Sequence, residues 1–322
     1  MANSVQFGWR VPDFPEVMLP DPHQRAQVLR DQIFNYMDTI QDGLDSAWVG
    51  DHFFPWPAAE AMDQSLDTHE AWTILTYLMA RYTRMTMGTI VLSQSYRPPA
   101  LMAKAAAVLQ WLSGGRLIFG IGAGWKENEY RAYGYDFPSN PVRLAQLEEY
   151  VQVLRQMWTE ESPTFQGKYY RIDNAYCAPR PKPVPPLMIG GAGPKVTLRI
   201  VAKYADWCNL NGFDVEMCRS RLDILRQHCL AIGRDYHSIG ISYSNDCVAV
   251  APSHAQAEHM TNASFFRHSN TQIMGTPDEV AAQIQPLVDL GVSHFIFRFV
   301  DFPRTEGVRL FMDEVMPRFK QN

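Results

Sequence analysis

Short apolar runs alternate with longer amphipathic segments along most of the chain. Eight runs have the length and residue types of buried strands: 5–11, 46–52, 84–92, 116–123, 186–191, 206–211, 240–250 and 294–300. The segments between and after them have the apolar spacing of helices: 22–43, 68–82, 98–113, 140–159, 194–204, 214–233, 253–263 and 277–290. Eight strands that alternate with eight helices predict an α/β protein with the fold of a (β/α)8 TIM barrel.

One segment departs from this alternation. Residues 163–186 contain Gly167 between two strand-like runs and then a proline-rich stretch. We expect a small β-hairpin inserted before the fifth strand, which either covers a pocket or decorates the barrel. The last helix should begin at "GTPDEV", with Thr276 as its N-cap and Pro277 in its first turn. No repeat or linker interrupts the pattern, so residues 1–322 are expected to form a single domain.

Composition and charge narrow the class of partner. The chain has 322 residues, 46% of them hydrophobic, and a formal net charge of -5. A nucleic-acid or anionic-membrane surface would require clustered Lys and Arg, so we expect a small-molecule partner, no nucleic acid and no membrane. The N-terminal sequence lacks a basic region with an apolar core, and no stretch reaches about 18 uninterrupted apolar residues. Neither export nor membrane insertion is expected.

The cysteines suggest neither a disulfide framework nor a metal centre. There are five, an odd number, and none forms a CxxC pair: Cys177, Cys208, Cys218, Cys229 and Cys247. This usage fits a reducing compartment, so we expect a cytoplasmic protein without a metal site.

The second predicted strand ends in titratable residues. In a (β/α)8 barrel the active site lies at the carboxyl ends of the strands, and "VGDHFFPWP" places Asp51 and His52 at such an end. A histidine can exchange a proton near neutral pH, and an adjacent carboxylate can orient it. His52 therefore either takes part in chemistry or only packs and hydrogen-bonds within its loop.

Two further strand ends are rich in glycine. In "GIGAGWKENEY" the glycines leave the backbone open to a flat or phosphorylated ligand, although they would also ease packing at the barrel rim. A Rossmann fingerprint is disfavoured because Trp125 follows Gly124 and no acidic residue ends a strand about 20 residues later. "IGGAGPKVTLR" is either a tight turn or a phosphate site formed by amide groups, a helix start and Lys195. Together with the Asp-His pair, these ends favour a phosphorylated aromatic cofactor.

With these motifs the chain resembles the luciferase-like flavin and deazaflavin oxidoreductases, and within them the coenzyme F420-dependent branch. The matching stretches are "VGDHF", "GTIVLSQSYRPPALMAKAAAVLQWLSGGRLIFGIGAGWKENEYRAYGYDFP", "PTFQGKYYRIDNAYCAPRP", "PPLMIGGAGPKVTLRIVAKYADWCN" and "GTPDEVAAQIQPLVDLGVSHFIF". The resemblance implies coenzyme F420 as cofactor. FMN is the alternative, because FMN-dependent members share the same barrel.

The resemblance also implies roles for individual residues. Asp51 would lie near the cofactor ring, and His52 would transfer a proton or steady the reduced ring. A non-proline cis peptide bond between Ile90 and Val91 would support the ring from behind. The remaining contacts to the ring, the tail and the phosphate would come from Ser93, Ala123, Gly124, Asn128, Ala192, Gly193, Lys195 and Val196.

Two departures from the family pattern bear on the reaction. Sugar-phosphate dehydrogenases of the family have a glutamate where this chain has Trp125, which argues against sugar phosphate oxidation. Bacterial luciferase has a cysteine and an arginine where this chain has Gly122 and Ala123, which weakens the case for FMN held in the luciferase manner.

We therefore expect an oxidoreductase that transfers a hydride between coenzyme F420 and an unidentified small organic substrate. Catalysis would rest on Asp51 and His52, with Glu129 the next candidate proton source, and the substrate pocket would be walled by Phe53, Phe54, Trp56 and Trp125. One alternative is an FMN-dependent monooxygenase supplied with reduced flavin by a separate reductase. Another is a barrel without catalysis that serves as a binding protein. A homodimer is expected in each case.

Overall fold

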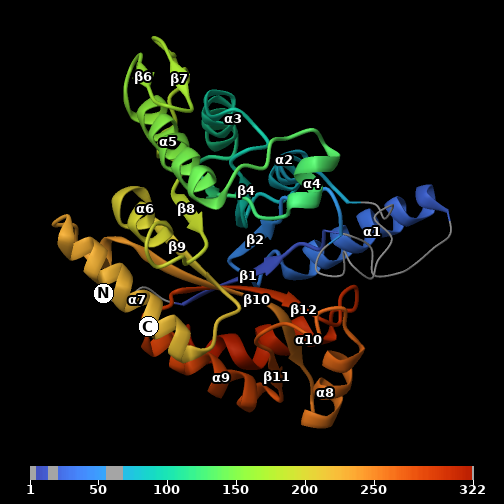
Figure 1. The fold of residues 1–322 in the computed structure, drawn as a ribbon. Coiled ribbons are helices and arrows are strands. Elements are labelled where there is room, and N and C mark those ends of the chain that lie inside the picture. The colour runs from blue at the N-terminus through green and yellow to red at the C-terminus, as the bar shows by residue number, and fades with distance from the viewer. Residues whose placement is uncertain (1–4, 14–20, 56–67, 321–322) are drawn as a thin grey trace.

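The computed structural model describes residues 5–13, 21–55 and 68–320. Within these ranges, eight parallel strands close into a barrel (Figure 1): β1 (Gln6–Arg10), β2 (Ser46–Val49), β3 (Thr86–Thr89), β5 (Leu117–Gly122), β8 (Leu187–Gly190), β9 (Trp207–Asn211), β10 (Gly240–Val250) and β12 (His294–Phe299). Each strand pairs with the next in this order, and β12 pairs with β1, which closes the ring. The predicted (β/α)8 TIM barrel is confirmed.

Helices surround the barrel, and each predicted helical range contains one of them. They are α1 (Pro22–Ile40), α2 (Ala71–Arg81), α3 (Pro99–Leu112), α5 (Asn140–Thr159), α6 (Thr197–Tyr204), α7 (Val215–Ala231), α8 (His254–Ala263) and α9 (Pro277–Asp289). The start of α9 is a capping box, in which the Thr276 side chain accepts from the Glu279 N–H and the Glu279 carboxylate accepts from the Thr276 N–H. The sequence therefore predicts this helix start correctly.

Several short elements escape the periodicity. They are α4 (Glu127–Ala132), η1 (Tyr236–Ser238), β11 (Ile273–Gly275), α10 (Glu306–Leu310), the π-helical turn η2 (Phe311–Val315) and η3 (Met316–Arg318). β11 extends the sheet by pairing with the end of β10. Segments this short do not contain enough apolar positions to establish a period.

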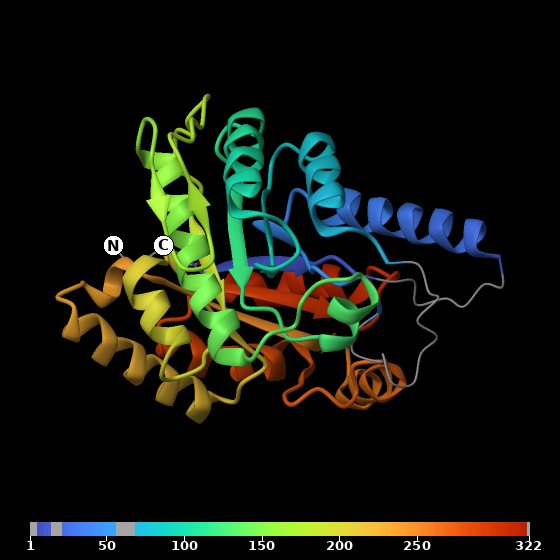
Figure 2. The ribbon, with the colours of Figure 1, turned by 45° about the horizontal axis from the view of Figure 1, so that its top comes forward.

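The predicted insertion is an antiparallel hairpin of β6 (Phe165–Gln166) and β7 (Arg171–Ile172). It is fixed to α5 because the Glu149 carboxylate accepts hydrogen bonds, at 2.7 to 3.0 Å, from the N–H groups of residues 168–170. Figure 2 shows the hairpin, in lime, on the same side of the barrel as α2 and α3. None of residues 163–186, all of them described, lines the cavity at the barrel mouth. The hairpin thus decorates the scaffold and does not cover that cavity.

The third predicted strand is interrupted at the position where the family resemblance implied a cis peptide bond. β3 ends at Thr89, and the two-residue strand β4 (Leu92–Ser93) continues along β5. The peptide bond between Ile90 and Val91 is cis, as expected.

Alternation along the strands decides which side chains enter the barrel. On each strand, every second side chain points outward and packs against the helices in the main core, as Phe7, Phe295 and Phe297 do. The side chains between them point inward and form a small apolar cluster in the barrel interior, which includes Trp48, Ile90, Ile118, Met188 and Ile296. This cluster fills the barrel interior below the strand ends, so a cavity forms at their carboxyl side.

Candidate active site

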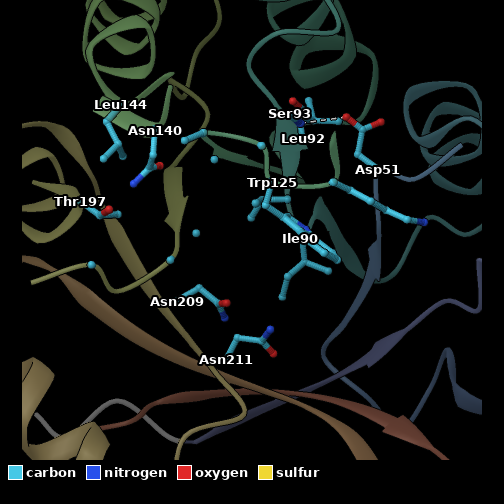
Figure 3. A pocket seen from close by; sticks show the side chains of 18 of the residues that line it. Asp51, Ile90, Leu92, Ser93, Trp125, Asn140, Leu144, Thr197, Asn209 and Asn211 are labelled. Atoms are coloured by element: carbon cyan, nitrogen blue, oxygen red, sulfur yellow. Dashed lines mark hydrogen bonds between the residues drawn. The ribbon is translucent and has the colours of Figure 1, made fainter. Parts of the chain in front are cut away.

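A cavity of about 590 Å³ lies at the carboxyl ends of the strands. Its size is in the range of pockets for cofactors and small ligands. Figure 3 shows Asn209 and Asn211 on the side of the cavity opposite Asp51 and Ser93. Most of the predicted site residues line it: Asp51, His52, Ile90, Val91, Ser93, Ala123, Gly124, Trp125, Gly193, Lys195 and Val196.

The loop after β2 presents His52 to the cavity. Its Nδ1 lies 3.2 and 3.1 Å from the two carboxylate oxygens of Glu129, and its ring meets Trp125 edge to face with centroids 5.7 Å apart. A ring nitrogen that faces a carboxylate carries its proton as a donor, so Nε2 is the unprotonated nitrogen of the neutral ring. Glu129 thus fixes both the orientation of His52 and its tautomer.

The Glu129 carboxylate is fully buried and surrounded by donors. Besides His52, the donors are Nζ of Lys126 at 2.9 Å, the N–H groups of Phe53 and Phe54 at 3.1 and 3.0 Å, and the hydroxyl of Tyr96 at 3.1 Å. Burial alone would raise the pKa of Glu129, but the contacts with His52 and Lys126 outweigh burial and lower it. Glu129 is therefore a positioning carboxylate that holds the loop after β2, and a poor proton source.

Asp51 is already paired within the protein. Both of its oxygens accept hydrogen bonds from Arg97, at 2.8 and 2.9 Å, and Oδ2 also accepts from the Ser93 N–H at 2.9 Å. Arg97 forms a second ion pair with Glu70 at the start of α2. Burial would lower the pKa of Arg97, but the two carboxylates outweigh burial and raise it. Asp51 thus ties β4 to the loop after β2, which leaves His52 as the better candidate for proton transfer.

Glycines keep the backbone open around residues 90 and 91. A Cβ atom at Gly190 would lie 2.6 Å from Cγ2 of Val91, and one at Gly122 would lie 3.0 Å from the same atom. Gly124 has a φ of +74°, and a Cβ there would lie 2.6 Å from the Ser93 hydroxyl. Side chains at 122 and 190 would collide with Val91, so the glycines there leave room for the Val91 side chain at the cavity wall.

The loop between β8 and α6 presents amide groups and a cation. Within the described residues, the N–H groups of Gly193, Lys195 and Val196 have no acceptor. The exposed Lys195 has no ion-pair partner in the same ranges, whereas Arg199 and Lys203 on α6 both pair with Glu148. An anion placed here would gain amide hydrogen bonds and the favourable end of the helix dipole.

The structure adds polar residues that the sequence reasoning missed. Asn209 and Asn211 from β9 and Ser244 from β10 form one wall of the cavity. The Ser244 hydroxyl lies 3.3 and 3.0 Å from the Oδ1 atoms of Asn209 and Asn211. The signal in the sequence was a pair of polar residues two positions apart at a predicted strand end, which places both on the interior face.

The sequence analysis also missed a charged residue of the cavity, Arg10. It lines the cavity from β1, and its Nη1 lies 2.6 Å from Oδ1 of Asp246 on β10. Arg298 on β12 donates to Asp13 at 3.0 Å and to Asp246 at 3.4 Å, so two arginines and two carboxylates are buried together. Burial would raise the pKa of Asp13, but Arg298 and Arg10 outweigh burial and hold it well below its usual value. These four charges compensate one another.

Not every predicted site residue reaches the cavity. The Asn128 side chain accepts the N–H of Glu129 within α4, and Ala192 is buried outside the lining. Phe53 packs on Tyr133, with ring centroids 4.3 Å apart, behind the loop after β2. Trp56 lies outside the described residues.

Metal centres and membrane-spanning helices are both absent from the described ranges. No group of three or more His, Cys, Asp or Glu side chains there is placed to hold a metal ion. The helices in the same ranges lack the combination of length and apolar content that a membrane crossing requires. All five cysteines are buried and free.

The family is given by comparison with known proteins. Residues 40–272 match the family model of luciferase-like monooxygenases. The chain belongs to the luciferase-like monooxygenase family. A relative from Kineococcus radiotolerans, named F420-dependent glucose-6-phosphate dehydrogenase, is 30% identical over 308 residues, which cover 86% of this chain and 89% of that protein. A protein of the same name from Amycolatopsis mediterranei is 27% identical over 314 residues, which cover 86% and 91%.

A solved structure shares the fold. An F420-dependent secondary alcohol dehydrogenase in complex with an F420-acetone adduct superimposes with a TM-score of 0.82 and 20% identity, over 99% of this chain and 100% of that chain. The resemblance stated from the sequence, to luciferase-like proteins and to their F420-dependent branch, is thus confirmed.

Proposed function

We propose that this protein transfers a hydride between coenzyme F420 and a small organic substrate, with His52 exchanging the accompanying proton. The observation that carries the proposal is the placement of His52, held by Glu129, on the wall of a cavity that residues 90 and 91 also line. The names of the curated relatives support the choice of cofactor.

The residues present fit a deazaflavin. Ile90 and Val91 line the cavity and would support a flat ring, and the glycines at 122 and 190 leave room for the Val91 side chain. Lys195 and the amide groups before α6 suit a phosphate. When bound, the deazaflavin would supply or accept the hydride.

The proton would pass through Nε2 of His52. As a neutral ring, His52 can accept the proton of a substrate hydroxyl, and as an imidazolium it can donate a proton to a carbonyl oxygen. Glu129 provides the counter-charge at Nδ1 in the second case. Trp125 stands beside the His52 ring and would limit the access of water to the substrate.

A titration tests the cofactor assignment. The purified protein is titrated with coenzyme F420 and, separately, with FMN, each followed by fluorescence quenching. We expect binding of F420 near one equivalent, with an affinity at least about tenfold higher than for FMN, which corresponds to about 1.4 kcal/mol. Preference for FMN would support the monooxygenase alternative instead. Failure to bind either cofactor would support the non-catalytic barrel.

We also propose a homodimer and a cytoplasmic location. Trp111 and Leu112 at the end of α3 are 62% and 65% exposed, and apolar side chains this exposed favour burial against a second copy of the chain. Light scattering would measure the mass of the assembly. The five free, buried cysteines suit a reducing compartment.

A further inference from the structure

The charged side chains of the cavity are compensated almost completely by the protein itself. Those that line it are Arg10, Asp51, Lys126, Glu129 and Lys195. Arg10 pairs with Asp246 at 2.6 Å, and Asp51 with Arg97 at 2.8 Å. Lys126 pairs with Glu129 at 2.9 Å and also donates to the carbonyl groups of Phe54 and Pro55.

Lys195 is the exception, and its place in the chain explains it. It lies in the loop before α6, which the proposed function assigns to the cofactor phosphate. A bound cofactor would therefore use this charge. With it in place, the rest of the described cavity lining offers a substrate no cation that lacks a carboxylate partner.

The sequence shows that the remaining segments contain no cationic side chain either. Residues 1–4, 14–20, 56–67 and 321–322 contain no Lys, Arg or His at all. The longest of them, "WPAAEAMDQSLD", follows the loop after β2 and contains three acidic residues. The charged side chains of this segment are all acidic.

The polar groups that remain for a substrate are neutral. Asn209, Asn211 and Ser244 offer amide and hydroxyl groups, and Asn211 is exposed at the end of β9. Such groups can hydrogen-bond a hydroxyl or a carbonyl oxygen. They do not compensate a phosphate or a carboxylate that has lost its water, which requires charge-assisted partners.

We propose that the substrate is an uncharged organic molecule with a hydroxyl or carbonyl group at the reacting carbon, and that phosphorylated and carboxylated compounds are excluded. This inference rests on the proposed function. In the oxidising direction, the C–H bond of the substrate would break with both electrons leaving as a hydride to the oxidised cofactor, while His52 accepts the hydroxyl proton and a carbonyl forms. In the reducing direction, the carbonyl carbon would take up a hydride from the reduced cofactor, while His52 donates a proton to the carbonyl oxygen. The substrate class would thus differ from that in the names of the curated relatives.

Binding of anionic sugars to the loaded protein tests this inference. The F420-loaded protein is titrated calorimetrically with glucose 6-phosphate and with glucuronate at constant ionic strength, and turnover is followed by the absorbance of F420. The relative from Amycolatopsis mediterranei named for glucose 6-phosphate serves as the positive control. We expect no saturable binding below about 10 mM and no turnover. Saturable binding in that range, or turnover of either sugar, would overturn the proposal.

A variant that supplies the missing cation tests the physical reason. In Asn211→Lys, loaded with F420, we expect glucose 6-phosphate to bind at least about tenfold more tightly than in the wild type. Asn211→Gln keeps a neutral amide of similar length and should behave like the wild type. Equal binding in both variants, with both folded and loaded, would show that charge compensation does not govern selectivity.

Failure of the proposed function is measured separately. Loading with F420 is followed by fluorescence quenching before any sugar is added, so the absence of F420 binding counts against the cofactor assignment. In that event the Lys195→Met protein, which lacks the one cation without a carboxylate partner in the described lining, is titrated without cofactor. Saturable binding of glucose 6-phosphate to this variant overturns the charge argument, and no binding supports it.

Discussion

At the residue scale, the site depends on how few atoms remain available to a ligand. The carboxylate of Asp51 is held by Arg97 and that of Glu129 by Lys126 and three other donors besides His52. His52 is held through Nδ1, so a proton that its ring exchanges would pass through Nε2. Two neighbouring residues that look like a catalytic pair in the sequence therefore have different partners and different tasks.

The first prediction separates a chemical role of His52 from a packing role. His52→Asn keeps much of the side-chain volume but cannot titrate, so we expect F420 affinity within a few-fold of the wild type and turnover lower by about a hundredfold or more. Single-turnover hydride transfer between pH 5 and 9 measures this, with any substrate that the loaded enzyme converts. If rates and pH profiles match the wild type while stability changes by about 1 kcal/mol, His52 only packs.

The second prediction concerns the buried charge of Glu129. Glu129→Gln leaves the buried Lys126 without its carboxylate, which should lower the free energy of unfolding by about 3 kcal/mol. Denaturant unfolding at pH 7 measures the loss. Glu127→Gln, which breaks an exposed ion pair with Arg131 on the same helix, is the control and should cost less than about 1 kcal/mol.

The pH dependence of stability gives an independent check on the same residue. The pKa of Glu129 is lowered in the folded protein, so its contribution is present above the ordinary value of 4.5 and is lost as the pH falls through the folded pKa. The Glu129→Gln protein should lack this acid-dependent loss. If the free energy of unfolding of the variant fell as steeply at acidic pH as that of the wild type, Glu129 would not be the source of this loss.

At the element scale, the start of a helix or the end of a strand determines which polar groups of the protein face the cavity. The loop before α6 presents three amide groups without described acceptors, while α4 carries Glu129 to the back of the loop after β2. The third prediction follows from the first of these loops.

Gly193→Asp should weaken cofactor binding and leave the fold intact. The new carboxylate would stand next to a bound phosphate, and its Cβ would lie 2.9 Å from the Thr197 hydroxyl. We expect a loss of about 2 kcal/mol, or roughly thirtyfold in affinity. Gly193→Asn has nearly the same shape without the charge, so it separates repulsion from crowding. Unchanged affinity in the Asp variant would remove this loop from the cofactor site.

At the scale of the whole molecule, the barrel interior contains a buried titratable group that does not line the cavity. His294 on β12 is buried between Trp48 and Trp207, and its Nε2 lies 2.7 Å from the Ser46 hydroxyl. Burial lowers the pKa of His294 to about 4, because the charged form is not solvated there. Folding therefore favours the neutral ring.

The fourth prediction is an acid-dependent loss of stability from His294. Between its unfolded pKa of 6.5 and its folded pKa of about 4, the unfolded chain binds the proton more strongly, so stability falls as the pH falls through this window. The loss should total about 3 kcal/mol. Denaturant unfolding of the wild type and of His294→Asn between pH 7 and 4 measures it. An equally steep decline in the variant would assign the loss to other groups.

The sequence by itself determined the fold and the regions that face the mouth of the barrel. Apolar periodicity is a local property, because each strand and helix must bury one face, and it predicted the strands and helices of the barrel correctly. The positions of His52, Gly124 and Lys195 followed from the rule that ligands bind at the carboxyl ends of barrel strands. The hydrogen-bond and ion-pair partners of these residues could not be predicted from the sequence.

Only the tertiary structure decided the partners, because barrel closure brings together strand ends that are distant in the chain. Asp51 stands next to His52 in the sequence but binds Arg97, 46 residues away, while His52 binds Glu129, 77 residues away. Arg10 and Asp246 are separated by 236 residues and meet because β1 and β10 both border β12. A charge in the sequence is either free for a ligand or compensated within the protein. The difference is set by a counter-charge that no local pattern reveals.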